Sequence, residues 1–408
     1  MEPYRAARRS RSAAMVLIAL LSCLTLVTKV WAAEPRPITP ANDTTTKHGF
    51  DHFYNMEYDK AIKDFETVVK EHPDDPFPNN YLLSAVLFKE LYRVGALNSE
   101  AYASDNFLSA RAKRPLDPAA QTRIKALIAR TETLTAQRLQ MNPNDVDALY
   151  ARGVARGMRS TYMGMGEKAW LASVRSALAA RRDHERVLEL DPNYVNAKMI
   201  VGIHNYIIGS LNWAARTAIT VVSVGGSKSK GLDYLRAVAK SNTVATTDAK
   251  IALALFLRRE QKYQEALDLV RGMTEQYPHS FLLAQEYGDL LTAAGHGREA
   301  MAQYQATLAN CRKNYFPLPE PEHAAWGLGV AARGQREFQV AAEAFDLAAT
   351  TPNAESTMVD KANLAAGQMY DLLQKRDLAV KRYQAAAASN GDSADLAKKY
   401  LRQPYRGE

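Results

Sequence analysis

The chain has 408 residues, of which 47% are hydrophobic and 24% are charged. This composition is ordinary for a folded protein and excludes collagen-like and low-complexity chains. The formal net charge is +8, but the first 32 residues carry five basic residues and one acidic residue, so their removal would leave +4. The other charges are interspersed along the chain. No stripe of basic and aromatic residues indicates nucleic-acid binding.

The N-terminal residues 1–32 have the order of a signal peptide. Basic residues up to Arg11 precede an apolar run from Ala13 to Val27, and Ala32 offers a small residue for cleavage. The run is shorter than the about 20 apolar residues of a transmembrane helix. We therefore expect export with cleavage after Ala32. An alternative stays open, because the segment ending at Cys23 resembles a bacterial lipobox, in which this cysteine would carry a lipid anchor.

Residues 33–47 are rich in proline and threonine, which predicts a flexible spacer before the folded part of the chain. After cleavage, Cys311 would be the only cysteine left. We therefore expect no internal disulfide, even in an oxidising compartment.

One spacing recurs five times: a small residue, an alanine twelve positions later and usually an aromatic residue four positions after that. The sets are Gly49, Ala61 and Phe65; Ala254, Ala266 and Val270; Gly288, Ala300 and Tyr304; Gly329, Ala341 and Phe345; and Gly367, Ala379 and Tyr383. Apolar residues recur every three to four positions in each copy, which predicts two amphipathic helices joined by a short polar turn. The small residues, such as Gly329 and Ala341, are expected to face each other, with the aromatic residue beside them. A period of about 34 residues indicates stacked helical units.

These positions resemble the tetratricopeptide repeat pattern, and the leader suggests an exported bacterial protein of that type. The resemblance implies an all-α fold, a right-handed α-solenoid of about eight helix pairs with stretched, irregular central units. We expect N-terminal and central units with insertions over residues 48–245. Regular units and a capping helix, Ser393 to Leu401, are expected over residues 246–408.

The middle of the chain also repeats. Met141–Gly153 and Leu190–Gly202 align without gaps, and each reads as a helix stop followed by a helix start. Their prolines, Pro143 and Pro192, are 49 residues apart. We expect the excess over the usual period to lie in a long helix over Trp170–Leu190 and a loop around residues 163–166.

Gly209–Gly226 is predicted to be an insertion between a helix that ends near Ile208 and one that begins near Leu232. Its side chains, including Leu211 and Trp213, are too apolar for a merely solvated loop. We favour a segment that covers neighbouring units; the alternative is a surface for a partner or a bilayer. His204 lies just before it on an apolar helix, either as a buried polar anchor or as part of a binding pocket. Gly225 to Ser229 imitates a phosphate-binding loop, but its glycine and lysine are wrongly spaced.

Catalytic and metal-binding patterns are weak. Serine, histidine and acidic residues occur without a nucleophile elbow or another catalytic signature. His48 and His52 are four positions apart and could face one way toward a metal, but the repeat register favours surface or interface histidines. We predict no cofactor and no metal site.

By the resemblance, the first helix of each pair lines an inner groove that binds peptides or proteins. Its expected lining residues are Gln285, Asp289, Asn363 and Tyr370, with Arg333 and Lys361 nearby. The lysine, asparagine and arginine set of a carboxylate clamp cannot be assembled. The expected function is a non-catalytic exported scaffold for protein interactions in the cell envelope or periplasm. The alternatives are a small-ligand binder or enzyme with its pocket in the irregular centre, Met158–Gly226, or a membrane-associated assembly factor.

Overall fold

The computed structural model describes residues 43–97, 114–211, 225–389 and 391–407. Within these ranges the chain is helical throughout and contains no β-strand, and the residues from Ala41 onward form one compact unit. None of the described helices is long and apolar enough to cross a membrane. The leader lies outside the described ranges, so its cleavage and a lipid on Cys23 remain predictions.

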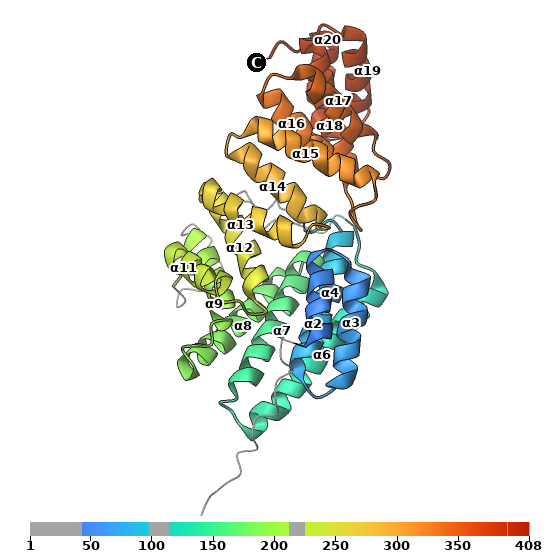
Figure 1. The fold of residues 1–408 in the computed structure, drawn as a ribbon. Helices are drawn as coiled ribbons and strands as arrows, with labels where there is room; N and C mark the ends of the chain where they lie inside the picture. The colour runs from blue at the N-terminus through green and yellow to red at the C-terminus, as the bar shows by residue number, and fades with distance from the viewer. Residues whose placement is uncertain (1–42, 98–113, 212–224, 390, 408) are drawn as a thin grey trace, which may run out of the picture. The chain divides into compact units, whose positions relative to one another are not determined.

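The described helices form eight consecutive pairs and a terminal helix (Figure 1). The first four pairs are α2 (Thr44–Tyr54) with α3 (Tyr58–Glu71), α4 (Pro76–Arg93) with α6 (Pro118–Met141), α7 (Val146–Thr161) with α8 (Trp170–Leu190), and α9 (Ala197–Ser210) with α11 (Lys228–Ala239). The other four are α12 (Thr246–Arg259) with α13 (Tyr263–Gln276), α14 (Phe281–Ala293) with α15 (Gly297–Arg312), α16 (Pro321–Gly334) with α17 (Phe338–Thr350), and α18 (Ser356–Leu372) with α19 (Arg376–Ala387). The last helix is α20 (Ser393–Arg402). The all-α repeat fold and the predicted number of pairs are confirmed.

The recurring glycine makes room for the aromatic ring of its own pair. A methyl group added at Gly329 would lie 2.5 Å from Cδ1 of Phe345, and one added at Gly288 would lie 2.6 Å from Cε1 of Tyr304. Both rings are buried. The predicted place of the aromatic residue beside the glycine is confirmed, whereas the expected facing of Gly329 and Ala341 remains a prediction.

The turn inside a regular pair has a left-handed residue two positions before the second helix. Gly295 takes this conformation with φ 81°, and Arg336 and Gln374 take it with φ 61° and 58°. The next amide closes the end of the first helix: Glu337 N–H donates to the Ala332 carbonyl at 2.9 Å. This bond is the Schellman closure, which satisfies carbonyls that the helix end leaves free.

The central units are stretched, as predicted. Helix α6 has 24 residues and α8 has 21, against 14 in α13. The expected loop around residues 163–166 is instead a single π-helical turn, η2 (Tyr162–Gly166), that continues α7. The Tyr162 hydroxyl holds this turn by donating to Glu167 Oε1 at 2.9 Å.

Two predicted boundaries are corrected. Helix α2 begins at Thr44, so the predicted spacer does not extend to residue 47. The cause is Asp43, whose carboxylate accepts the backbone N–H groups of Thr45 and Thr46 and so caps the helix. Helix α11 begins at Lys228, earlier than the start expected near Leu232. Ser227 caps this end by accepting the Lys230 amide.

A buried amide network fixes α4 between α6 and α7. Asn79 Nδ2 donates to the Leu127 carbonyl and to Thr131 Oγ1, both at 2.7 Å. Asn80 Nδ2 donates to the Ala151 carbonyl at 2.8 Å, and its Oδ1 accepts from Thr131 at 3.0 Å. These bonds satisfy polar groups that would otherwise be buried at a cost. They set which face of α4 points toward the interior of the repeat array.

The first pair also contacts helices far along the chain. Tyr54 on α2 donates a hydrogen bond to Asp248 on α12 at 2.9 Å, and its ring lies 5.0 Å from that of Tyr277. Asn55 accepts the His279 amide at 2.9 Å. These contacts bring the inner faces of α2 and α12 to one enclosed space.

Candidate functional site

The first helices of the six N-terminal pairs enclose a cavity of about 1390 Å³. These helices are α2, α4, α7, α9, α12 and α14, and α8 adds a further wall. Most lining side chains are apolar; representative ones are Phe53, Tyr81, Val154, Leu178, Ile203, Ile207, Leu255 and Leu283. Leu171 lines the cavity although it is 76% exposed, so the cavity meets solvent beside the N-terminus of α8.

The cavity meets solvent beside Leu171, so it holds water when no ligand is bound. Because its walls are mainly apolar, an apolar occupant is favoured by about 25 cal/mol for each Å² removed from water.

One wall carries the Tyr54–Asp248 pair. Burial raises the pKa of Asp248 to about 6, and the hydrogen bond from Tyr54 acts in the opposite direction. Burial and the charge of Asp248 raise the pKa of Tyr54 well above its ordinary value. Tyr54 is therefore a protonated donor at neutral pH, and Asp248 is a carboxylate already engaged in a hydrogen bond.

His204 lines the cavity from α9. Its Nδ1 is buried and has no hydrogen-bond partner among the described residues. Burial lowers the pKa of His204 to about 3, and the nearby charge of Arg181 contributes. The ring is therefore neutral at physiological pH and unpaired at one nitrogen. Both interpretations offered by the sequence stay open, because His204 is a buried polar residue and also lines the cavity.

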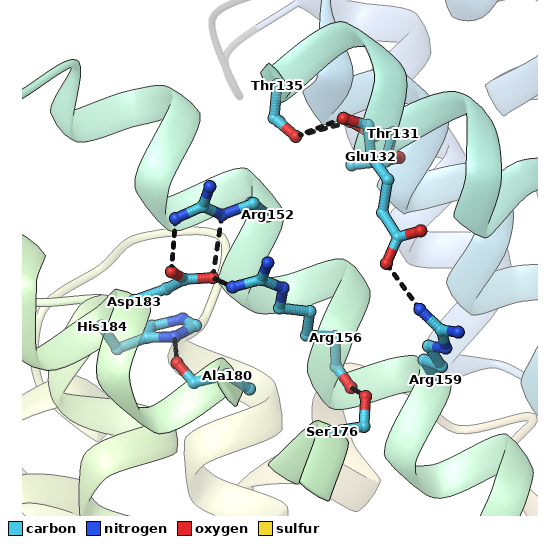
Figure 2. Close-up of polar contacts among 10 residues, drawn as sticks. All are labelled: Thr131, Glu132, Thr135, Arg152, Arg156, Arg159, Ser176, Ala180, Asp183 and His184. Carbon is cyan, nitrogen blue, oxygen red and sulfur yellow. Dashed lines mark hydrogen bonds and ion pairs between the residues drawn. The ribbon is translucent and has the colours of Figure 1, made fainter. Parts of the chain in front are cut away.

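A second polar cluster holds α7 against its neighbours and is shown in Figure 2. Arg152 makes two hydrogen bonds to the Asp183 carboxylate, at 2.7 and 3.1 Å, and Arg156 adds a third at 2.6 Å. Arg159, one turn further on, donates to Glu132 of α6 at 2.8 Å. The Asp183 side chain is only 6% exposed. Because all five side chains are engaged, this cluster positions helices and leaves no free reactive group.

His184 packs in the core of its helix pair. Its Nδ1 donates to the Ala180 carbonyl at 2.8 Å, and its ring lies where other pairs place an aromatic side chain, against Gly153 (Figure 2). Burial lowers the pKa of His184 to about 4. The residue is a neutral part of the core.

The residues considered for a metal site and for a phosphate-binding loop form other contacts in the described ranges. These ranges hold no group of three or more histidine, cysteine, aspartate or glutamate residues that could bind a metal. His52 contacts Glu57 and Asp64 within its own helix pair. Lys228, from the segment that imitates a phosphate-binding loop, forms an ion pair with Glu260 at 2.7 Å.

The predicted groove residues on α14, Gln285 and Asp289, form hydrogen bonds within the protein. Gln285 Nε2 donates to Asp289 Oδ1 at 3.0 Å. The same carboxylate accepts from the Tyr304 hydroxyl at 2.6 Å and lies 3.8 Å from Arg258. These side chains link α14 to its neighbours and are only partly accessible.

The groove residues on α16 and α18 differ in accessibility. Asn363 is 5% exposed and donates to the Val359 carbonyl, and Tyr370 is 7% exposed and donates to Asp346. Neither is the open groove position that was expected. Arg333 is exposed, with its guanidinium 6.0 Å from the Phe345 ring centre. Lys361 lies 4.8 Å from the Trp326 ring centre.

The insertion is described only at its ends. Leu211 ends α9 and lines the cavity, as do Gly225 and Gly226. Trp213 lies outside the described residues, so its proposed role remains a prediction.

The sequence interpretation missed the walls contributed by α2, α4 and α12. In the sequence, aromatic residues such as Phe50, Tyr54 and Tyr81 look like ordinary core residues of the repeats. Asp248 looks like an acidic residue in the first turn of a helix. No local signal brings Tyr54 and Asp248 together, because 194 residues separate them.

Comparison with known proteins supports the repeat pattern. A tetratricopeptide repeat family model matches residues 288–355. No relative of the chain is found among the curated proteins. The human IFIT1 dimer with m7Gppp-AAAA is a similar solved structure, with 14% identity over 90% of this chain and 84% of that chain and a TM-score of 0.42. The APC/C hetero-tetramer Cut9-Hcn1 is another, with 13% identity over 88% of this chain and 70% of that chain and a TM-score of 0.35.

The matched segment runs from α14 to the residue before α18. The contact between glycine and an aromatic ring recurs outside it, at Gly49 with Phe65 and at Gly367 with Tyr383. Residues 288–355 are therefore similar to tetratricopeptide repeats, and helix pairs on both sides of them share the glycine–aromatic contact.

Proposed function

We propose that this protein is a non-catalytic binding protein that holds a large apolar ligand in its central cavity. The observation that carries the proposal is the mainly apolar space of about 1390 Å³ between the first helices of six pairs. Typical small-molecule sites have about 300–1,000 Å³ and an apolar lining with a few placed polar groups. The cavity is larger than this range and has the same kind of lining. A long or many-ringed molecule fits it best.

The polar groups of the cavity favour binding over catalysis. A nucleophile needs a base within hydrogen-bond reach, and the Asp248 carboxylate is instead paired with the Tyr54 phenol, whose raised pKa keeps it protonated. His204 is neutral and has no acidic partner among the hydrogen bonds of the described residues. The opening beside Leu171 gives an apolar molecule a way in.

A fluorescence titration with the neutral apolar dye N-phenylnaphthylamine tests this proposal. Leu255 lines the cavity, and Leu378 is 45% exposed on α19 outside it. Leu255→Trp would fill part of the cavity and weaken dye binding about tenfold or more, which corresponds to at least 1.4 kcal/mol. Leu378→Trp, the matched control, would leave dye binding unchanged.

Both variants should keep the helical circular dichroism of the parent protein. If Leu255→Trp does not fold, Ile203→Trp tests the same wall from α9. Equal dye affinity in the parent protein, a folded cavity variant and the control would refute the proposal.

The C-terminal pairs support a second proposal, a surface for a protein partner. The cavity ends at α14, so the first helices α16 and α18 lie outside its walls. They carry the exposed Arg333 and the Lys361–Trp326 contact, a cation beside an aromatic ring of the kind found at interfaces. Cross-linking in intact cells should yield a specific partner that the Arg333→Glu, Lys361→Glu double variant loses. Identical cross-links in both proteins would count against this surface.

We also propose that the protein is exported and works in the cell envelope or periplasm. The support is the order of basic, apolar and small residues in the first 32 positions. The intact mass of the native protein tests it: cleavage after Ala32 gives a chain that begins at Ala33. A diacylglycerol adduct on Cys23 would instead assign the lipoprotein form, and a mass that includes Met1 to Trp31 would reject export with cleavage.

A further inference from the structure

Two unpaired polar groups lie on α8 and α9, helices that contribute to the cavity wall. Nη1 of Arg181 and Nδ1 of His204 are both buried without a hydrogen-bond partner among the described residues. A buried polar atom without a partner costs free energy, and a charged one costs more. A single acceptor beside the cavity wall could satisfy both atoms.

The two side chains lie close to each other and to the same part of the cavity wall. His204 lines the cavity directly. Ala177 and Leu178 also line it, and Arg181 lies one helical turn further along α8 on the same face. Nη2 of Arg181 lies 3.5 Å from the carbonyl oxygen of Gly225, which is itself a lining residue. The charge of Arg181 is also close enough to affect His204.

The chemistry of the two groups defines the missing partner. A guanidinium has only donors, so the missing partner of Nη1 must be an acceptor. Glu185 accepts from Nε of Arg181 at 2.7 Å, but its side chain is 40% exposed, and it leaves Nη1 unpaired. His204 is neutral and can turn one N–H toward the same acceptor.

His184 does not join them. Its Nδ1–H already donates to Ala180, so the neutral ring offers only a lone pair at Nε2. The local charge is therefore that of Arg181, partly offset by Glu185. Such a site suits a single negative charge. A planar carboxylate matches the planar guanidinium.

We propose that the cavity ligand is a long-chain carboxylic acid whose carboxylate binds Arg181 and His204 while its chain lies along the apolar walls. This inference rests on the proposed function, since it names the chemical class of the molecule held in the cavity. The apolar walls supply affinity without regard to the head group, and the two unpaired groups supply the preference for an acid.

Competition against bound N-phenylnaphthylamine tests the inference at neutral pH. Palmitate and cetyl alcohol have the same chain length and differ in the head group. Palmitate should displace the dye at a concentration at least about tenfold lower than the alcohol, as expected for one charge-assisted contact. In Arg181→Met the two competitors should become nearly equal, while the affinity for the neutral dye stays the same.

Arg182→Met is the matched control, because Arg182 is the next residue on α8 and its side chain is exposed. It should keep the full preference for palmitate. If Arg181→Met does not fold, His204→Phe takes its place, since it removes the second donor and keeps an aromatic ring on the cavity wall. A several-fold loss of the preference is expected for this variant.

The outcomes separate the two proposals. Dye binding with no preference for palmitate in the parent protein would overturn the carboxylate site and leave the apolar cavity standing. A preference that survives in Arg181→Met, or is lost equally in Arg182→Met, would also overturn it. Failure of the dye to bind the parent protein would refute the proposed function itself.

Discussion

The hydroxyl of Tyr54 donates a 2.9 Å hydrogen bond to Asp248 Oδ1, although the two residues are 194 positions apart. Tyr54 belongs to the first helix pair and Asp248 to the fifth. Stacked repeats on their own contact only their neighbours. This bond and the contact of Tyr54 with Tyr277 therefore convert the inner faces of the N-terminal pairs into the walls of one cavity.

The buried carboxyl group predicts a stability that depends on pH. Burial raises the pKa of Asp248 from 3.8 to about 6, so the folded chain keeps a proton that the unfolded chain has lost. Its contribution to the free energy of unfolding is therefore greatest below pH 3.8 and is lost as the pH rises to about 6. Asp248→Asn should be more stable than the parent protein at neutral pH by about 1–3 kcal/mol.

Urea unfolding over a pH series measures this effect. Tyr54 can still donate to the amide oxygen of the variant, so the hydrogen bond is kept. The advantage of Asp248→Asn should shrink as the pH falls and disappear below pH 4, where both side chains are neutral. A variant that is less stable than the parent protein at neutral pH would contradict the account.

Removal of the Tyr54 hydroxyl should lower the stability of the protein at neutral pH, whereas Asp248→Asn should raise it. Tyr54→Phe leaves the Asp248 carboxylate without its bond and should lower the free energy of unfolding by about 1–2 kcal/mol at neutral pH. Tyr287→Phe on α14 is the control, because no hydrogen bond of the Tyr287 hydroxyl occurs among the described residues. Equal urea midpoints for the two variants would show that the contact between the first and fifth pairs adds nothing to stability.

Replacement of glycine by alanine should lower the stability of the protein at one position and raise it at another. Gly329→Ala places a methyl group 2.5 Å from the buried ring of Phe345 and should cost about 1–3 kcal/mol. Gly272 lies inside α13 with open space around it, so Gly272→Ala should stabilise by about 0.5–1 kcal/mol through its helix propensity. Thermal melts of both variants check this. A Gly329→Ala midpoint at or above that of the parent protein would rule out the proposed packing.

In the arginine cluster of Figure 2, loss of the Asp183 charge should lower stability more than loss of one arginine. Asp183→Asn removes the charge that pairs with Arg152 and Arg156, so it should destabilise by about 1–3 kcal/mol. Arg156→Met should cost less, because Arg152 keeps both of its bonds to Asp183. Chemical unfolding with Arg182→Met as a surface control measures both. The cluster would have no structural role if Asp183→Asn matched that control.

The regular pairs could be predicted from the sequence because their information is local. A glycine, an alanine and an aromatic residue at fixed spacing define two helices and the face on which they meet, and Gly367 with Tyr383 behaves as Gly49 does with Phe65. The ring of Phe345 fills the space beside Gly329, as the spacing predicts for the aromatic position.

The cavity could not be predicted because it depends on contacts between distant pairs. His204 was identified as a possible pocket residue from its place on an apolar helix. The Tyr54–Asp248 contact, which brings other helices to the same cavity, joins residues far apart in the sequence. The groove residues Asn363 and Tyr370 have the expected repeat register. Their side chains nevertheless bond within the protein, to Val359 and Asp346, which repeat spacing alone does not reveal.

Mass spectrometry under non-denaturing conditions tests the central claim most directly. The protein would be purified without detergent from the cells that produce it, beside its Leu255→Trp variant. The account predicts a mass above that of the mature polypeptide, caused by a small apolar molecule that organic solvent extracts and that the variant binds less. A bare polypeptide mass, together with no binding of N-phenylnaphthylamine, would contradict the claim that the cavity is a ligand site.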